Sequence, residues 1–242
     1  MNKKLLSVAI ATALTAGFTA APAQAEIEVS GNVALTTDYR FRGISQSDES
    51  AAIQGGFDLA HESGFYIGTW GSSVDFDTNG DGYDGSLELD YYGGWASSIG
   101  DTDFGIDIAY YYYDYPGDDG DEGDYQEFYV GGSWKDLSIQ VNYSDDYYAE
   151  TDEFWYVSGD YSFSFMDTID VGLHVGGNFL EEDGGFLSSD EDYYTDYSVT
   201  LTYTWATVDF SLAYVGTDLD EDDVFGTDWA DDTAVFTISK SL

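Results

Sequence analysis

A run of acidic and glycine residues in the first half of the chain has the spacing of a calcium-binding loop. Asp77–Glu88 reads DTNGDGYDGSLE and matches the pattern D-x-[DN]-x-[DN]-G-x5-E. In such a loop, oxygen ligands at positions 1, 3, 5 and 12 surround the ion, which makes Asp77, Asn79, Asp81 and Glu88 the candidate ligands. The flanking segments read as strands rather than helices, however. Diffuse binding of divalent cations by all the acidic loops is therefore the alternative.

Carboxylates and two arginines recur at alternate positions of several segments, on the face opposite the apolar side chains. In a closed sheet, that polar face would line a central lumen. A lumen lined by carboxylates concentrates cations and repels anions. The alternative is that the arginines and carboxylates form structural ion pairs that plug the lumen. The residues predicted to line it are Asp38, Arg40, Arg42, Asp58, Glu88, Asp90, Asp107, Glu127, Asp160, Asp170, Asp196 and Asp209, and Glu28 has the same parity.

The histidines offer little for catalysis. His61 and His174 are the two in the chain, and His61 falls in a predicted turn. His174 has inward parity near Asp170, and serine or asparagine neighbours could be arranged with it into a triad. No local motif supports such a triad, so we expect no enzymatic activity and no catalytic cofactor.

The composition narrows the classes of function further. The chain of 242 residues has 48 acidic residues against 6 Lys and Arg, a formal net charge of -42. This charge excludes nucleic acid as a main partner, because phosphate binding needs a basic surface. With 22 Tyr and 15 Phe, the chain has too much aromatic surface for a disordered acidic tail. The absence of cysteine excludes disulfides, thiolate metal sites and a lipid-modified cysteine.

The first 25 residues have the pattern of a signal peptide. Lys3 and Lys4 form a positive start, and the apolar stretch 5–18 follows. An A-x-A cleavage site ends at Ala25, which would leave Glu26 as the first residue of the processed protein. The alternative is an uncleaved anchor, for which the apolar stretch is short. We therefore expect one domain, over residues 26–242.

Strand-like alternation organises that domain. Leu137–Ser144 places apolar residues on one face and Ser, Gln and Asn on the other, and 197–205 repeats this pattern with threonines. Segments of about ten residues with this alternation suit tilted strands that cross a bilayer. No later segment has 18 consecutive apolar residues, so a transmembrane β-barrel and a soluble secreted protein are the alternatives. The twelve predicted strands are about 27–42, 51–60, 65–76, 86–96, 103–113, 125–134, 137–144, 153–163, 169–179, 193–205, 208–216 and 232–242.

Short and long connections alternate along the chain. Every second join is a short turn, and the joins between them are mostly longer and carry more than half of the 48 acidic residues. Short periplasmic turns opposite longer extracellular loops are typical of bacterial outer-membrane barrels with an even strand number. The short joins are 61–64, 97–102, 135–136, 164–168 and 206–207.

Aromatic residues near the strand ends indicate two interfacial belts. Trp95, Trp134 and Trp205 each precede a short join on the apolar parity of their strand, which favours a periplasmic belt. The alternative is that these rings form the core of a soluble sandwich. The residues predicted for the outer belt are Tyr39, Tyr110, Tyr112, Tyr143, Tyr197 and Tyr214.

The stretch 32–76 resembles a known family. The runs 36–47 (TTDYRFRGISQS), 52–57 (AIQGGF) and 68–72 (GTWGS), followed by 87–94 (LELDYYGG), are similar to the proteobacterial TorF porin family, also called Gcw-chp. The resemblance implies an outer-membrane barrel with a signal peptide, surrounded by lipid and inserted by the barrel assembly machinery. Such barrels usually finish on an aromatic residue, whereas this chain finishes on Leu242, with Lys240 on the apolar parity.

These patterns predict a channel for passive diffusion of small cationic or neutral solutes across the bacterial outer membrane. The alternative is a non-conducting outer-membrane protein whose acidic loops bind divalent cations such as calcium, and through them anionic lipopolysaccharide, or other partners.

Overall fold

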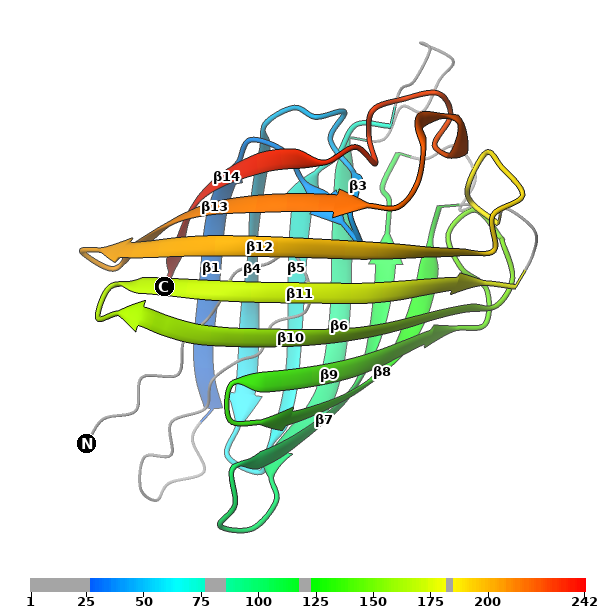
Figure 1. Cartoon of the computed structure of the whole chain (residues 1–242). Helices are drawn as coiled ribbons and strands as arrows, with labels where there is room; N and C mark the ends of the chain where they lie inside the picture. The colour runs from blue at the N-terminus through cyan, green and yellow to red at the C-terminus, as the bar shows by residue number, and fades with distance from the viewer. Residues whose placement is uncertain (1–26, 77–85, 118–122, 182–184) are drawn as a thin grey trace.

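The computed structural model describes residues 27–76, 86–117, 123–181 and 185–242. Within these ranges twelve antiparallel strands close into a barrel in which each strand pairs with its neighbours in the chain (Figure 1). The first and last strands close the sheet through a register that runs from Asn32 opposite Ser241 to Thr36 opposite Thr237. The strands are β1 (Ile27–Thr36), β4 (Ala52–His61), β5 (Phe65–Ser73), β6 (Leu87–Ser98), β7 (Phe104–Asp114), β8 (Tyr125–Trp134), β9 (Leu137–Ser144), β10 (Phe154–Met166), β11 (Ile169–Leu180), β12 (Tyr193–Trp205), β13 (Val208–Thr217) and β14 (Thr233–Ser241).

The outer surface of the barrel is apolar because each strand alternates in the predicted sense. On β12, Val199, Leu201 and Tyr203 are about half exposed, whereas the threonines between them, Thr200 and Thr202, are buried. A continuous apolar surface on the outside would be unfavourable in water and is what the hydrocarbon of a bilayer covers. The closed sheet also leaves no unpaired strand edge, which lipid could not satisfy.

Connections at the two ends of the barrel differ in length. At one end, here called the turn end, neighbouring strands are joined by short turns such as Lys135-Asp136. The turn between β12 and β13 consists of Ala206 (φ 50°) and Thr207 (φ 69°), both in the left-handed region that a type I′ hairpin turn requires. At the opposite end, here called the loop end, the connections are longer, as predicted from the acidic joins.

Helical structure is minor in the described residues. A single 3-10 turn, η1 (Glu221–Asp223), lies in the connection between β13 and β14. No helix in the described ranges is long and apolar enough to cross a membrane.

The predicted first strand, 27–42, is too long. Strand β1 ends at Thr36, and residues 37–51, here called the plug segment, turn into the barrel instead of continuing along its wall. The plug segment contains a short hairpin, β2 (Arg40–Phe41) and β3 (Ile44–Ser45), whose turn has Arg42 at φ 49° and Gly43 at φ 86°. A Cβ atom at Gly43 would lie 2.3 Å from Thr217 Cγ2, so only glycine lets the hairpin approach β13 this closely.

Most of the aromatic residues predicted for the two belts face outward. At the turn end, Trp134 and Trp205 face outward, with Trp205 64% exposed, and Trp95 pairs with the outward-facing Phe65. Tyr39 is the exception, because it lies in the plug segment, is 3% exposed and is enclosed by the barrel. The outer-belt tyrosines that lie on outward-facing positions are Tyr110, Tyr112, Tyr143, Tyr197 and Tyr214.

Residues 1–26, which include the predicted signal peptide and its cleavage site between Ala25 and Glu26, lie outside the described residues, so that assignment stays a prediction.

Candidate functional site in the barrel lumen

The strands place the predicted carboxylates on the inner face of the barrel, and their role in lining a pore stays a prediction. Three of them, Asp107, Asp160 and Asp209, are partly exposed to the interior space. Others lie beneath the plug segment, where Glu127 is completely buried. The carboxylates carried inward by strands are Asp58, Glu88, Asp90, Asp107, Glu127, Asp160, Asp170, Asp196 and Asp209.

Asp38, Arg40 and Arg42 also lie inside the barrel, but on the plug segment rather than on the wall, which corrects their predicted position. Arg40 donates to Asp38 and Glu49, at 3.0 Å for Glu49, and to the backbone carbonyl of Trp229. Asp38 in turn accepts a hydrogen bond from the Ser45 hydroxyl at 2.7 Å. These contacts hold the two strands of the hairpin together and tie them to the β13–β14 connection.

Arg42 anchors the plug segment to the barrel wall. Its Nη2 donates to both carboxylate oxygens of Glu127, at 2.7 and 2.9 Å, and its Nη1 to the Tyr147 hydroxyl at 3.1 Å. The guanidinium also lies over the rings of Tyr156 and Phe41, 4.4 and 4.7 Å from their centroids. Burial alone would lower the pKa of Arg42, but the Glu127 carboxylate outweighs it and the pKa lies well above its ordinary value.

One wall of the lumen is rich in tyrosine, and the sequence analysis did not identify these residues. Tyr111 and Tyr113 are buried inside, and Tyr92 donates its hydroxyl to Asp58 at 2.6 Å. Their inward orientation could have been predicted from the alternation of β7, because Tyr111 and Tyr113 occupy odd-numbered positions, as does the inward-facing Asp107. The Tyr92 and Tyr113 hydroxyls donate hydrogen bonds to Asp58 and Glu127 without neutralising their charge.

His174 is enclosed by acceptors rather than placed in a catalytic triad. Its Nδ1 lies 2.7 Å from Asp160 and its Nε2 lies 2.8 Å from Asp196. The Tyr156 hydroxyl is 3.0 Å from the same Nε2. An imidazole can donate to two carboxylates only when both nitrogens carry a proton, so this geometry is that of an imidazolium ion. Neither nitrogen is arranged as a base toward a serine hydroxyl.

The calcium-loop prediction falls largely outside the described residues. Asp77, Asn79 and Asp81 belong to the range 77–85, which the structure does not describe. Glu88, the fourth predicted ligand, lies at the start of β6, is 2% exposed and accepts the Tyr39 hydroxyl at 3.1 Å. The calcium site stays a prediction.

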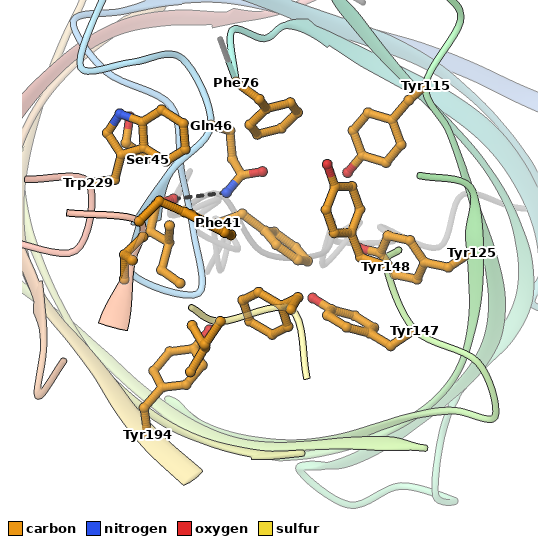
Figure 2. Close-up of a pocket in the computed structure, with 15 residues that line it drawn as sticks. Phe41, Ser45, Gln46, Phe76, Tyr115, Tyr125, Tyr147, Tyr148, Tyr194 and Trp229 are labelled. Atoms are coloured by element: carbon orange, nitrogen blue, oxygen red, sulfur yellow. Dashed lines mark hydrogen bonds between the residues drawn. The ribbon is translucent and has the colours of Figure 1, made fainter. Parts of the chain in front are cut away.

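An aromatic cavity of about 270 Å³ opens at the loop end, above the Arg42 anchor. Figure 2 shows Phe41 near its centre, with Tyr147 and Tyr148 on one side and Trp229 on the other. Its lining comes from the plug segment and from several connections far apart in the sequence, so no local motif could have identified it. The lining residues are Phe41, Ile44, Ser45, Gln46, Phe76, Tyr115, Tyr125, Tyr147, Tyr148, Phe186, Leu187, Tyr194, Val224, Phe225 and Trp229.

Comparisons with known proteins agree with the barrel. A family model described as "Bacterial protein of unknown function (Gcw_chp)" matches residues 20–242. No curated protein matches the chain.

Solved porins share the fold at low sequence identity. The KdgM porin is 10% identical with a TM-score of 0.55, over 88% of this chain and 97% of that one. The NanC porin is 11% identical with a TM-score of 0.53, over 88% and 98%. An outer-membrane channel from Pseudomonas putida F1 is 12% identical with a TM-score of 0.52, over 96% and 100%. At these identities the likeness establishes the fold alone.

Proposed function

The chain belongs to the Gcw_chp family of bacterial proteins, and we propose that it is a channel for passive diffusion of small cationic or neutral solutes. Its closed barrel, apolar outer surface and porin fold are those of a bacterial outer-membrane protein. The turn end would face the periplasm and the loop end the exterior, as in bacterial barrels generally.

The distribution of charge inside the barrel is the observation that carries this proposal. Asp107 and Asp209 are partly exposed inside the barrel, and Asp160 is partly exposed beside His174, whereas Arg40 and Arg42 are held in ion pairs within the plug region. A narrow aqueous path with fixed carboxylates attracts cations and repels anions. Neutral solutes would meet no such barrier.

The plug segment favours a second candidate, a non-conducting outer-membrane protein. Arg42 and the aromatic residues around it lie inside the barrel toward the loop end, and Glu127 beneath them is fully buried. A barrel held permanently in this state would display its acidic loops without passing solutes. The channel proposal requires that a path persist beside the plug segment, or that the plug segment move.

Single-channel recording of the purified barrel in planar bilayers separates the two candidates. The channel proposal predicts discrete conductance steps for the unmodified protein. A folded barrel that stays silent at all voltages, but conducts when residues 40–45 are replaced by a Gly-Ser linker, would favour the plugged protein instead. Heat-modifiable migration on gels serves as the folding control for both proteins.

Two partner assignments belong to the same proposal. The acidic loops would hold divalent cations, calcium included, that bridge to anionic lipopolysaccharide. The barrel assembly machinery would insert a chain that finishes on Leu242. Lys240 faces the lipid side near that end and donates to Thr207 Oγ1 at 2.7 Å, which directs its charge to the interface.

A further inference from the structure

The aromatic cavity at the loop end has the geometry of a cage. The ring of Phe76 lies 6.0 Å from Tyr115, 6.2 Å from Tyr148 and 6.4 Å from Trp229, at interplanar angles of 63°, 52° and 65°. Tyr115 and Tyr148 are themselves 5.6 Å apart at 76°. These mostly edge-to-face contacts hold the four rings against one another along the lining of the cavity (Figure 2).

The cage is held in place by polar contacts behind the rings. Trp229 donates its indole N–H to Asp48 at 2.9 Å, and its backbone carbonyl accepts a hydrogen bond from the Ser45 amide at 2.8 Å. Gln46 is fixed by a hydrogen bond from its side-chain amide to the Ile44 carbonyl at 3.2 Å, which turns its amide oxygen toward the space between the rings (Figure 2). A cavity fixed before a ligand arrives loses little conformational entropy on binding.

The charge around the cavity determines whether it favours a cationic or an anionic ligand. Among the described lining residues there is no lysine or arginine, and the chain as a whole carries a formal charge of -42. Arg40 and Arg42, the nearest basic residues in the plug segment, are already paired with Asp38, Glu49 and Glu127. The field at the mouth therefore disfavours anions and favours cations.

The floor of the same cluster already holds a cation by its ring faces. The Arg42 guanidinium lies 4.4 Å from the Tyr156 centroid, 4.9 Å from Phe154 and 5.6 Å from Tyr147. Attraction between a cation and aromatic faces is thus part of how this region is built. Arg42 itself is engaged by both oxygens of Glu127, so it does not extend into the cavity above.

We propose that this cavity binds small organic cations of the quaternary ammonium class. A primary ammonium needs several hydrogen-bond acceptors when it leaves water, whereas most of the surface that this lining presents is carbon, with Ser45, Gln46 and the tyrosine hydroxyls as its polar groups. A quaternary ammonium has no N–H to satisfy and is recognised through ring faces. This inference deepens the proposed cation preference, but the site would exist whether or not the barrel conducts.

Calorimetric titration of the full-length processed barrel in detergent tests the site. Choline is compared with 3,3-dimethylbutan-1-ol, which has the same shape without the charge, at a sodium chloride concentration matched for ionic strength. We expect choline to bind at least about tenfold more tightly, as two or three favourable ring contacts would give. Equal affinity for the two compounds would overturn the proposal and identify an apolar cavity instead.

Leucine substitutions in the cage show whether the rings carry the binding. Phe41→Leu keeps apolar volume in the cavity but removes the central ring, and we expect it to weaken choline at least about fivefold while leaving dimethylbutanol unchanged. Phe186→Leu, which removes another ring of the lining beside Tyr147, serves if Phe41→Leu does not fold. Phe57→Leu, on the lipid-facing surface of β4, is the matched control and should change nothing. Choline binding that survives both cage substitutions would overturn the site.

The binding-site proposal and the channel proposal can be refuted independently of each other. A barrel that binds choline selectively but carries no current would refute the channel and leave the site. A barrel that conducts but binds choline no better than its neutral analogue would refute the site alone.

Discussion

Arg42 and Glu127 form a buried, two-point ion pair that joins the plug segment to the wall of the barrel. The residues are far apart in the sequence, and both side chains are almost completely inaccessible to solvent. Glu127 also accepts a hydrogen bond from Asn142 at 2.8 Å, so the pair is part of a network across β8 and β9. The pair therefore ties the tip of the plug segment directly to the barrel wall.

Breaking this pair should loosen the plug segment. Glu127→Gln leaves the Arg42 guanidinium buried without its counter-charge, which typically costs on the order of 3 kcal/mol. We expect a loss of about that size in urea unfolding from lipid vesicles, together with larger or noisier single-channel currents. The double variant Arg42→Met with Glu127→Gln removes both charges and should recover most of the stability. Unchanged stability and unchanged conductance in Glu127→Gln would contradict the anchoring role.

The turn between β12 and β13 should be improved by its preferred residues. Ala206 and Thr207 both adopt positive φ, which costs a non-glycine residue about 1–2 kcal/mol relative to its favoured conformations. Replacing them with Asn-Gly, the preferred pair for a type I′ turn, should stabilise the barrel by about 1 kcal/mol. Urea unfolding from vesicles measures the gain. A loss of stability would mean that the contact of Lys240 with Thr207 outweighs the backbone strain.

Asp232 should make the β13–β14 connection sensitive to acid. The Tyr214 and Tyr197 hydroxyls donate to it at 2.6 and 2.7 Å, and these hydrogen bonds hold the pKa of Asp232 below its ordinary value of 3.8. A carboxylate with a depressed pKa in the folded state adds stability above its unfolded pKa, and that stability is lost as the pH falls through the folded pKa. The melting temperature of the native barrel should therefore exceed that of Asp232→Asn at neutral pH, by a small margin because the carboxylate is exposed. The margin should shrink as the pH falls below 3.8 and vanish once the pH lies below the folded pKa. A margin that stays constant from pH 3 to pH 7 would contradict the assignment.

The strands could be predicted because lipid imposes a local rule on them. Val199 and Leu201 face outward and Thr200 faces inward, so the alternation can be recognised from residues that are adjacent in the sequence. The same rule gave a wrong prediction at the end of β1, where it extended the strand too far. Asp38, Arg40 and Arg42 alternate with Tyr39 and Phe41 as in a strand, but the segment follows the polar interior instead of the wall. The signal for a turn was Gly43, whose positive φ reverses the chain after Arg42.

The aromatic cavity could not be predicted, since its residues meet only in space. Phe76, Tyr115 and Trp229 come from three separate connections, and each taken alone reads as an ordinary loop aromatic.

The ion pairing of the arginines, by contrast, follows from the sequence. Buried guanidinium groups in a chain with so few basic residues must be compensated by carboxylates. Which carboxylate pairs with Arg42 depends on how deep the hairpin reaches, and only the structure gives that depth.

The reversal potential across a planar bilayer with a potassium chloride gradient tests the central claim most directly. If lumen carboxylates set the selectivity, the reversal potential should be shifted from zero toward the equilibrium potential of potassium. The double variant Asp107→Asn and Asp209→Asn should move it toward zero while the barrel stays folded. A reversal potential that favours chloride, or a potassium preference that the double variant leaves untouched, would contradict the account.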